Sequence, residues 1–318
     1  MPESETKREL HINWYPGHIA KAEKQLKEKI KLIDFVIEVR DARIPFASHH
    51  RNLKEWLGNK EYISVLNKSD LSDSEKTKLA QETIIKEKEA YASFIVDSRK
   101  NSLPANFLKA VDKLAAKATE KFKAKGILKR PARVMVVGYP NVGKSTIINR
   151  LSQTKKAKVE NRPGVTQQQQ WVKVKSKLDI LLLDTPGIIP QKLYSDDQAI
   201  KLALANCVSA KSFDAMELVL SSLPIIEKAY PGLICSYYKT EDELKDLKVK
   251  YELGEDAEDL SIIGKPDYLS VLIEKLAHKK GWIRKGSGGQ AEADMERAAL
   301  KIISDFREQK FGRINLEF

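Results

Sequence analysis

A glycine-rich segment from Gly138 to Ser145, GYPNVGKS, gives the strongest chemical indication in this chain. It has the spacing of a phosphate-binding P-loop, whose backbone N–H groups surround a polyphosphate at the start of a helix. We expect Lys144 to neutralise the terminal phosphates and Ser145 to ligate Mg²⁺. The expected nucleotide contacts of this loop and its helix come from Asn141, Val142, Gly143, Lys144, Ser145 and Thr146.

A second motif, Asn67-Lys68-Ser69-Asp70, can distinguish guanine from adenine. A carboxylate at Asp70 accepts hydrogen bonds from guanine N1–H and the exocyclic amine, and adenine offers neither. Ser98 and the backbone N–H of Arg99 are weaker candidates for a second guanine-binding loop. The P-loop precedes N-K-x-D in Ras-like GTPases, whereas here N-K-x-D comes first. The reversed order predicts a circularly permuted GTPase.

Two segments beyond the P-loop could sense the γ-phosphate. Asp184 begins the motif DTPG after an apolar run, and it could hold Mg²⁺ through water while the Gly187 N–H contacts the phosphate. Thr166, in RPGVT, could complete the Mg²⁺ shell, and a plain turn before a strand is the alternative. Asn141 could ligate a K⁺ ion between the phosphates, or simply be a turn asparagine.

Six strand-like segments must position these motifs. Most are continuous apolar runs typical of buried parallel strands, while QWVKV alternates and is expected at an antiparallel edge. The expected strands are 34–40, 62–66, 93–96, 133–137, 170–174 and 178–183, with helices over 20–31 and 74–90. This pattern predicts an α/β domain over residues 1–197, with the six-stranded, mostly parallel sheet of a small GTPase.

The pattern becomes helical after Pro190, and we predict an all-helical RNA- or ribosome-binding domain over residues 198–318. An apolar stripe from Met295 to Phe306 follows the helical period and is expected to lie in a core. A second helix is expected over 266–278, with a flexible joint at 286–289 between the two.

Charge and composition limit the partners and the compartment. The net charge of +12 favours an anionic partner such as RNA. A lysine-rich stretch over 113–130 could contact phosphates, or be a solvated helix face and linker. Two cysteines in 318 residues fit a reducing compartment, and no apolar run is long enough for a membrane helix. We therefore expect a cytoplasmic protein without a membrane partner.

Several motifs occur together in one order: WYPGH from Trp14, DARIP from Asp41, NKSD, GYPNVGKST, RPGVT and DTPG. With this set the chain resembles the ribosome biogenesis GTPase A (YlqF-like) family of circularly permuted GTPases, over nearly its whole length. The resemblance implies a GTPase that binds the precursor of the large ribosomal subunit, and its rRNA, late in assembly. We expect a monomer off the ribosome. DSRK in place of S-A-K and a polar linker near Gly286 depart from the family pattern.

The residue after DTPG is Ile188, where Ras-type GTPases carry the glutamine that orients the attacking water. Intrinsic hydrolysis is therefore expected to be slow. The resemblance implies that His18, in WYPGH, acts catalytically by positioning this water. A cap on the helix that follows is the alternative role of His18.

These features predict GTP-gated binding, in which the GTP form docks on rRNA and hydrolysis releases it. Three alternatives stay open from the sequence. The first is a GTPase that serves the small subunit or another ribonucleoprotein. The second is a metabolic ATPase or kinase, which NKSD argues against. The third is a scaffold that binds RNA and uses GTP without turnover.

Overall fold

The computed structural model describes residues 26–100, 102–124, 126, 130–152, 170–174, 179–184, 194–242, 266–286 and 290–318. These residues form two compact units. The sheet unit contains the described residues before 194 together with Ala205–Ser209 and Arg313–Phe318. The helical unit contains Tyr194–Leu204 and Ala210–Gly312. Both short segments of the sheet unit lie beyond residue 197, in the range predicted for the second domain.

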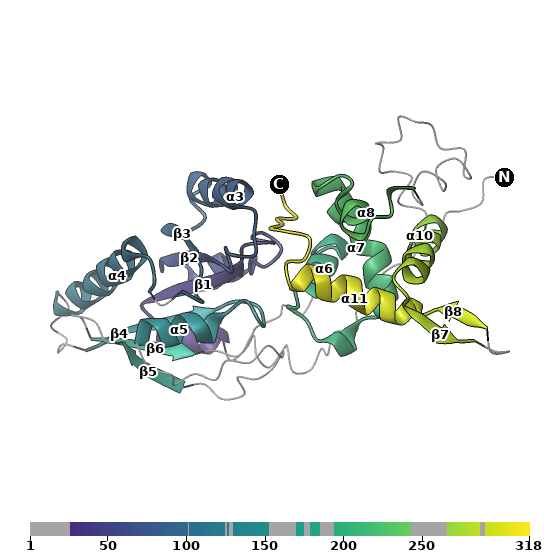
Figure 1. The fold of residues 1–318 in the computed structure, drawn as a ribbon. Coiled ribbons are helices and arrows are strands. Elements are labelled where there is room, and N and C mark those ends of the chain that lie inside the picture. The colour runs from purple at the N-terminus through teal and green to yellow at the C-terminus, as the bar shows by residue number, and fades with distance from the viewer. Residues whose placement is uncertain are drawn as a thin grey trace, which may run out of the picture. The chain divides into compact units, whose positions relative to one another are not determined.

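The sheet unit is built on six strands in the order β3-β2-β1-β4-β6-β5 (Figure 1). All neighbouring pairs are parallel except β5 with β6. The strands are β1 (Phe35–Asp41), β2 (Tyr62–Asn67), β3 (Ala92–Val96), β4 (Ala132–Val137), β5 (Gln170–Val174) and β6 (Ile180–Asp184). The predicted α/β class and the antiparallel edge strand are confirmed.

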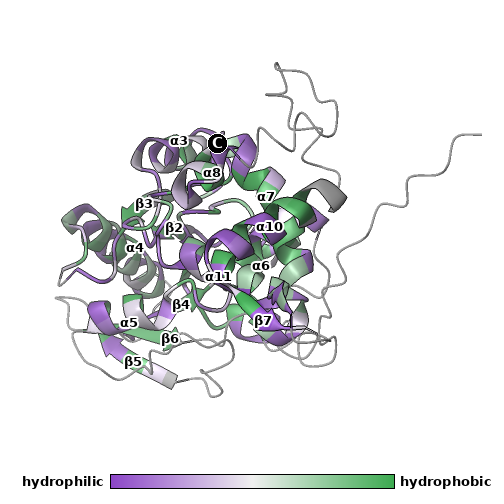
Figure 2. Ribbon diagram, turned by 45° about the vertical axis from the view of Figure 1, so that its right-hand side comes forward, coloured by the Kyte–Doolittle hydropathy of each residue, from purple (hydrophilic) through white to green (hydrophobic). Residues whose placement is uncertain are grey.

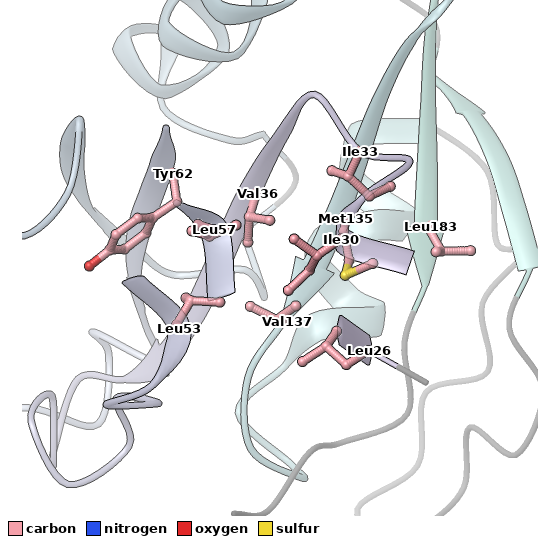
Figure 3. Close-up of a cluster of buried hydrophobic side chains, with 10 residues drawn as sticks. All are labelled: Leu26, Ile30, Ile33, Val36, Leu53, Leu57, Tyr62, Met135, Val137 and Leu183. Carbon is pink, nitrogen blue, oxygen red and sulfur yellow. The ribbon is translucent and has the colours of Figure 1, made fainter. Parts of the chain in front are cut away.

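One face of the sheet carries a continuous apolar row. Tyr62, Val36, Met135 and Leu183 are register partners across β2, β1, β4 and β6, so they lie side by side. Figure 3 shows this row covered by side chains from residues 26–33 and from helix α2 (Leu53–Leu57). Strands β4 and β6 are mostly hydrophobic in Figure 2, as expected for strands covered on both faces.

The opposite face is covered by helix α4 (Ala105–Lys123). The ring of Phe94 on β3, whose register partner is Val65, lies 5.5 Å from the ring of Phe107 on α4. Helix α5 packs against β4, β5 and β6. The sheet unit therefore has three layers. Its longer helices are α3 (Ser74–Lys86), α4 (Ala105–Lys123) and α5 (Lys144–Ser152).

The helical unit has its own core. The apolar stripe predicted in the last helix is buried at Ala298, Ile302 and Phe306, which confirms it as core. The helices are α6 (Asp196–Leu204), η1 (Ala210–Ser212), α7 (Ala215–Ala229), α8 (Leu233–Tyr238), α10 (Pro266–Lys279) and α11 (Met295–Arg307). The Tyr238 hydroxyl donates to Asp305 at 2.8 Å, which joins α8 to α11.

The predicted joint over 286–289 lies largely outside the described residues, and the structure has two strands beside it that the expected all-helical domain did not include. Two short antiparallel strands, β7 (Ile283–Lys285) and β8 (Ala291–Ala293), lie on either side of it. They are only three residues long and almost fully exposed, so they lack the apolar alternation that identifies longer strands. No helix in the described part of the chain is long and apolar enough to cross a membrane.

Candidate guanine nucleotide site

The described motif residues all follow the carboxyl ends of neighbouring strands. Asp41, Asn67 and Val96 are register partners at the ends of β1, β2 and β3, and the P-loop follows β4. Ligands of open parallel sheets bind at this edge. The permutation therefore changes the order of the motifs along the chain but not their order across the sheet.

Asn67 joins three of these loops. Its side-chain Nδ2 donates to the Val142 carbonyl in the P-loop at 2.8 Å, and its Oδ1 accepts from the Ser98 N–H at 3.2 Å. The side chain is almost completely buried. The amide thus fixes the spacing between the guanine-reading motif, the P-loop and the loop after β3.

Gly143 allows a P-loop backbone conformation that other residues rarely adopt. Gly143 has a φ of +100°, and a Cβ there would collide with Asn67 Nδ2. The buried Lys144 donates through Nζ to the Tyr139 carbonyl at 2.8 Å, and Ser145 and Thr146 lie in the first turn of α5. First-turn N–H groups lack intrahelical acceptors, so they are available to a polyphosphate. These residues fit the phosphates and Mg²⁺ of a nucleotide.

Asn141 is held by a segment that follows α6. Its Nδ2 donates to the Asn206 carbonyl at 2.8 Å, and its φ is +58°. A backbone carbonyl can only accept a hydrogen bond, so the amide must turn its nitrogen towards Asn206 and its Oδ1 away. The orientation of the Asn141 side chain, the predicted K⁺ ligand, is therefore fixed by a hydrogen bond within the sheet unit.

Asp70 forms an ion pair with the guanidinium of Arg99. Burial raises the pKa of the Asp70 carboxyl, nearby Asp97 raises it further, and Arg99 opposes both. The Arg99 N–H, which we predicted to lie near guanine O6, donates to Asp97 Oδ1 at 3.0 Å. In this loop the arginine side chain therefore pairs with Asp70, the carboxylate predicted to bind guanine.

Arg150 on α5 supports the same loop and was missed by sequence reasoning. Its Nε donates to the Ser98 carbonyl at 3.2 Å and its second terminal nitrogen to the Arg99 carbonyl at 3.1 Å. An arginine in the last turn of the helix after the P-loop has no sequence pattern that indicates such a role. Only the packing of α5 beside the loop after β3 reveals it.

Asp41 anchors the lysine of the guanine-reading motif. It accepts from Lys68 Nζ at 2.9 Å and from Arg43 through Nε at 2.9 Å and a terminal nitrogen at 2.8 Å. Burial alone would raise the pKa of Asp41, but Arg43 and Lys68 hold it well below its usual range. The DARIP motif thus positions Lys68, a role that the sequence did not indicate.

The segments Ala205–Ser209 and Arg313–Phe318 support this edge of the sheet. Arg43 donates to the Ala205 carbonyl at 3.2 Å. In the C-terminal segment the Ile314 N–H donates to the Leu71 carbonyl at 3.3 Å, and the Leu316 N–H donates to the Arg43 carbonyl at 2.9 Å. The first segment therefore touches the loop that carries DARIP, and the second touches both that loop and the residue that follows NKSD.

A partly buried cluster of two glutamates and a histidine has the composition of a metal site. Glu38, His49 and Glu89 lie close together, but Arg40 pairs with both carboxylates from within the cluster. Burial would raise the pKa of Glu38, yet Arg40 and His49 hold it well below its usual range. The arginine supplies the cation that the cluster needs, so we read it as a structural ion network.

Some predicted site residues lie outside the described part of the chain: His18, Thr166, Gly187 and Ile188. The backbone of Asp184 ends β6 and is the register partner of Val136. This places the start of DTPG next to the strand that leads into the P-loop.

A P-loop after β4, N-K-x-D after β2 and the buried amide between them define a circularly permuted P-loop GTPase. A family described as "50S ribosome-binding GTPase" matches residues 133–250. Two solved structures of YlqF also match: a GDP-bound form, with a TM-score of 0.57, and a GNP-bound form from T. maritima, with a TM-score of 0.58. Both structures are 26% identical in sequence to this chain. The match to the GDP-bound form covers 92% of this chain and 98% of that structure's chain. The match to the GNP-bound form covers 93% of this chain and 97% of that structure's chain.

Curated relatives match the chain from end to end. "Ribosome biogenesis GTPase A" of Bacillus licheniformis is 35% identical over 96% of this chain and 98% of its own length. The protein of the same name from Thermotoga maritima is 31% identical over 96% of this chain and 94% of its own length. This chain belongs to the ribosome biogenesis GTPase A family, and it is a GTPase.

Proposed function

We propose that this GTPase acts in the late maturation of the large ribosomal subunit. In the GTP state it binds the subunit precursor and its rRNA, and hydrolysis releases it. The Asn67 bridge between the P-loop and the guanine loops carries the nucleotide part of this proposal. The full-length similarity to ribosome biogenesis GTPases supports the ribosomal part. We also infer a cytoplasmic monomer off the ribosome, with residues 198–318 binding RNA.

Mg²⁺ would be held by Ser145 and Thr166, with Asp184 acting through water. The ion would neutralise charge on the phosphates as the bond to the γ-phosphate breaks. The residues of this chain would hold the nucleotide in place: Asp70 reads guanine, and Lys144 and the first turn of α5 hold the phosphates.

His18 is the proposed catalytic residue, since Ile188 cannot orient water. A His18→Ala variant should lose most of its ribosome-stimulated turnover while GTP affinity stays near wild type. A large loss of GTP binding would instead assign His18 a structural role. Turnover and nucleotide titration on the same preparation separate the two outcomes.

We propose that Asn141 ligates K⁺ through Oδ1. The hydrogen bond from Nδ2 to Asn206 supports this role, because it holds the amide in one orientation. K⁺ should accelerate hydrolysis and Na⁺ should not. Equal rates in the two salts would reject the proposal.

The decisive experiment measures GTP turnover in K⁺ buffer with no particle, with purified large subunits, and with purified small subunits. Strong stimulation by large subunits alone is the expected result. Stimulation by small subunits alone would favour the alternative of a small-subunit factor. Failure of both to stimulate, with GTP still bound, would contradict the proposed partner.

A further inference from the structure

Helix α4 presents a regular row of cations. Lys109, Lys113, Lys117 and Lys121 are all exposed and follow one another at four-residue spacing. We call these four residues the α4 lysine row. At a rise of about 1.5 Å per residue, the row extends roughly 18 Å along the helix. The apolar side of α4, including Phe107 and Leu114, is buried against the sheet unit.

We propose that the α4 lysine row is an RNA-binding surface that contacts the phosphate backbone of a structured RNA. This goes beyond the nucleotide site and lies in the sheet unit rather than in the helical unit. It rests on the proposed function only in expecting an RNA partner.

The four-residue spacing of the row brings like charges together, which is electrostatically unfavourable in the free protein. Like charges four residues apart on a helix repel one another, and the row contains three such pairs. Among the described carboxylates, one pairs with the row: Glu61 lies 3.0 Å from Lys117, and that lysine is largely exposed. No described carboxylate forms an ion pair with Lys109, Lys113 or Lys121. Helix α4 has five lysines against two acids, so the imbalance is local to it.

Two residues beside the α4 lysine row, Tyr91 and Lys60, are also consistent with an RNA-binding surface. Lys113 Nζ lies 6.0 Å from the ring centre of Tyr91, a side chain that is 39% exposed. An exposed tyrosine beside a cation offers a face on which a base can stack. Burial lowers the pKa of Lys60, and the charge of Lys121 contributes to that lowering. Asp34 opposes this shift, so the effect places one cation of the row, Lys121, near Lys60.

The composition of the surface selects RNA among anionic partners. Lysine is depleted at protein–protein interfaces, whereas rows of lysine neutralise phosphates and release counterions. A membrane-binding helix would need its apolar face exposed to lipid, and that face of α4 is buried. Lysine ammonium groups are flexible point charges, so the contact is expected to follow RNA shape and charge rather than sequence.

The test uses the full chain with GDP and a fluorescein-labelled RNA hairpin with a stem of about 20 base pairs, a length that spans two minor grooves. Binding is followed by anisotropy across KCl concentrations from about 50 to 200 mM, the range over which phosphate contacts are strongly attenuated. The variant changes all four row lysines to glutamine, which has a similar helix propensity.

The row variant should bind the hairpin at least tenfold more weakly at the lowest salt. The slope of log K against log salt should fall in magnitude by about 2–4, since each phosphate contact contributes about 0.7–0.9. Its melting temperature should be unchanged or slightly higher, because three repulsive pairs are removed. An unchanged melting temperature also shows that weaker binding is not caused by misfolding.

A matched control removes the same four charges elsewhere in the sheet unit. The control changes exposed lysines outside the row to glutamine: Lys31, Lys54, Lys78 and Lys86. Its salt slope should change by less than about 1, one phosphate contact. Equal losses in both variants would mean that only net charge matters, and an unchanged row variant would also overturn the proposal.

Different results would contradict the proposed ribosomal function and the proposed RNA-binding surface. If large subunits do not stimulate wild-type turnover but hairpin binding depends on the row, the ribosomal function is wrong and the RNA surface stands. If stimulation is strong and the row variant binds the hairpin like wild type, the RNA surface is wrong and the ribosomal function stands.

Discussion

Replacing Asp41 by asparagine tests the buried ion network beneath the guanine loops. Asp41 is fully buried and accepts four hydrogen bonds, three from Arg43 and one from Lys68. An amide keeps one acceptor oxygen and brings its own N–H groups against these donors. Arg43 is 3% exposed, so it would lose its buried counter-charge.

Removing one partner of a buried ion pair costs about 3–5 kcal/mol. For a unit of this size, about 2–4 °C of melting temperature is lost per kcal/mol, so a fall of roughly 6–20 °C is expected. The Lys68→Gln control leaves the Asp41–Arg43 pair intact. Since the Lys68 side chain is partly exposed and Asp41 keeps its bonds from Arg43, that control should cost less, about 1–3 kcal/mol.

The pH dependence gives an independent check. Because the pKa of Asp41 is lowered in the folded state, its contribution to stability is fully present above its unfolded pKa, about 3.9. That contribution is lost as the pH falls through the lower folded value. Calorimetry should therefore show a constant deficit for Asp41→Asn between pH 5 and 8, which shrinks below about pH 4. A variant that melts within 2 °C of wild type at pH 7 would refute this account of the network.

Three further changes probe the loops around the site. Arg99→Ala removes the ion-pair partner of Asp70. Because the Arg99 side chain is 69% exposed, the pair is worth at most about 1 kcal/mol, so GDP should bind up to about fivefold more tightly at pH 7.5. Because Arg99 lowers the pKa of Asp70, titration with fluorescent GDP should show this variant losing affinity at a higher pH than wild type as the solution is acidified. Arg150→Ala removes the donor to two carbonyls of the loop after β3, so GDP release measured by stopped flow should be about tenfold faster. Arg150→Lys should only partly restore the slow release. Glu317→Gln weakens the carboxylate that accepts from the Phe46 and Ala47 N–H groups, and calorimetry should show a loss of about 1–2 kcal/mol while a Phe318→Leu control changes less.

The strands were predictable because burial on both faces leaves a direct record in sequence. Segments such as the one before Asn67 are continuous apolar runs, and the structure places every expected strand within two residues of its predicted limits. The P-loop and NKSD were recognisable because phosphate and guanine binding demand particular residue types at fixed spacing. Their convergence followed from the parallel sheet, since both motifs lie at its carboxyl edge.

The supporting contacts were not predictable, because they depend on distant pieces of chain that meet only in the fold. Arg150 supports the loop after β3 from 51 residues away, and nothing local marks it. The Asn315 side chain donates to the Ala42 carbonyl over 273 residues. The strands β7 and β8 were missed for another reason, since they are too short and exposed to carry a periodic pattern.

We propose that these distant contacts let the bound nucleotide act on the helical unit. The chain passes from α6 to η1 through Ala205–Ser209, and it leaves α11 into Arg313–Phe318. The first segment accepts hydrogen bonds from Asn141 and Arg43, and the second bonds to Ala42, Arg43 and Leu71. The stretch Ala210–Gly312 is therefore joined at each end to a segment that bonds to loops at the carboxyl edge of the sheet. A change in either loop on GTP hydrolysis would strain a segment that continues directly into the helical unit, so coupling needs no contact beyond the chain itself.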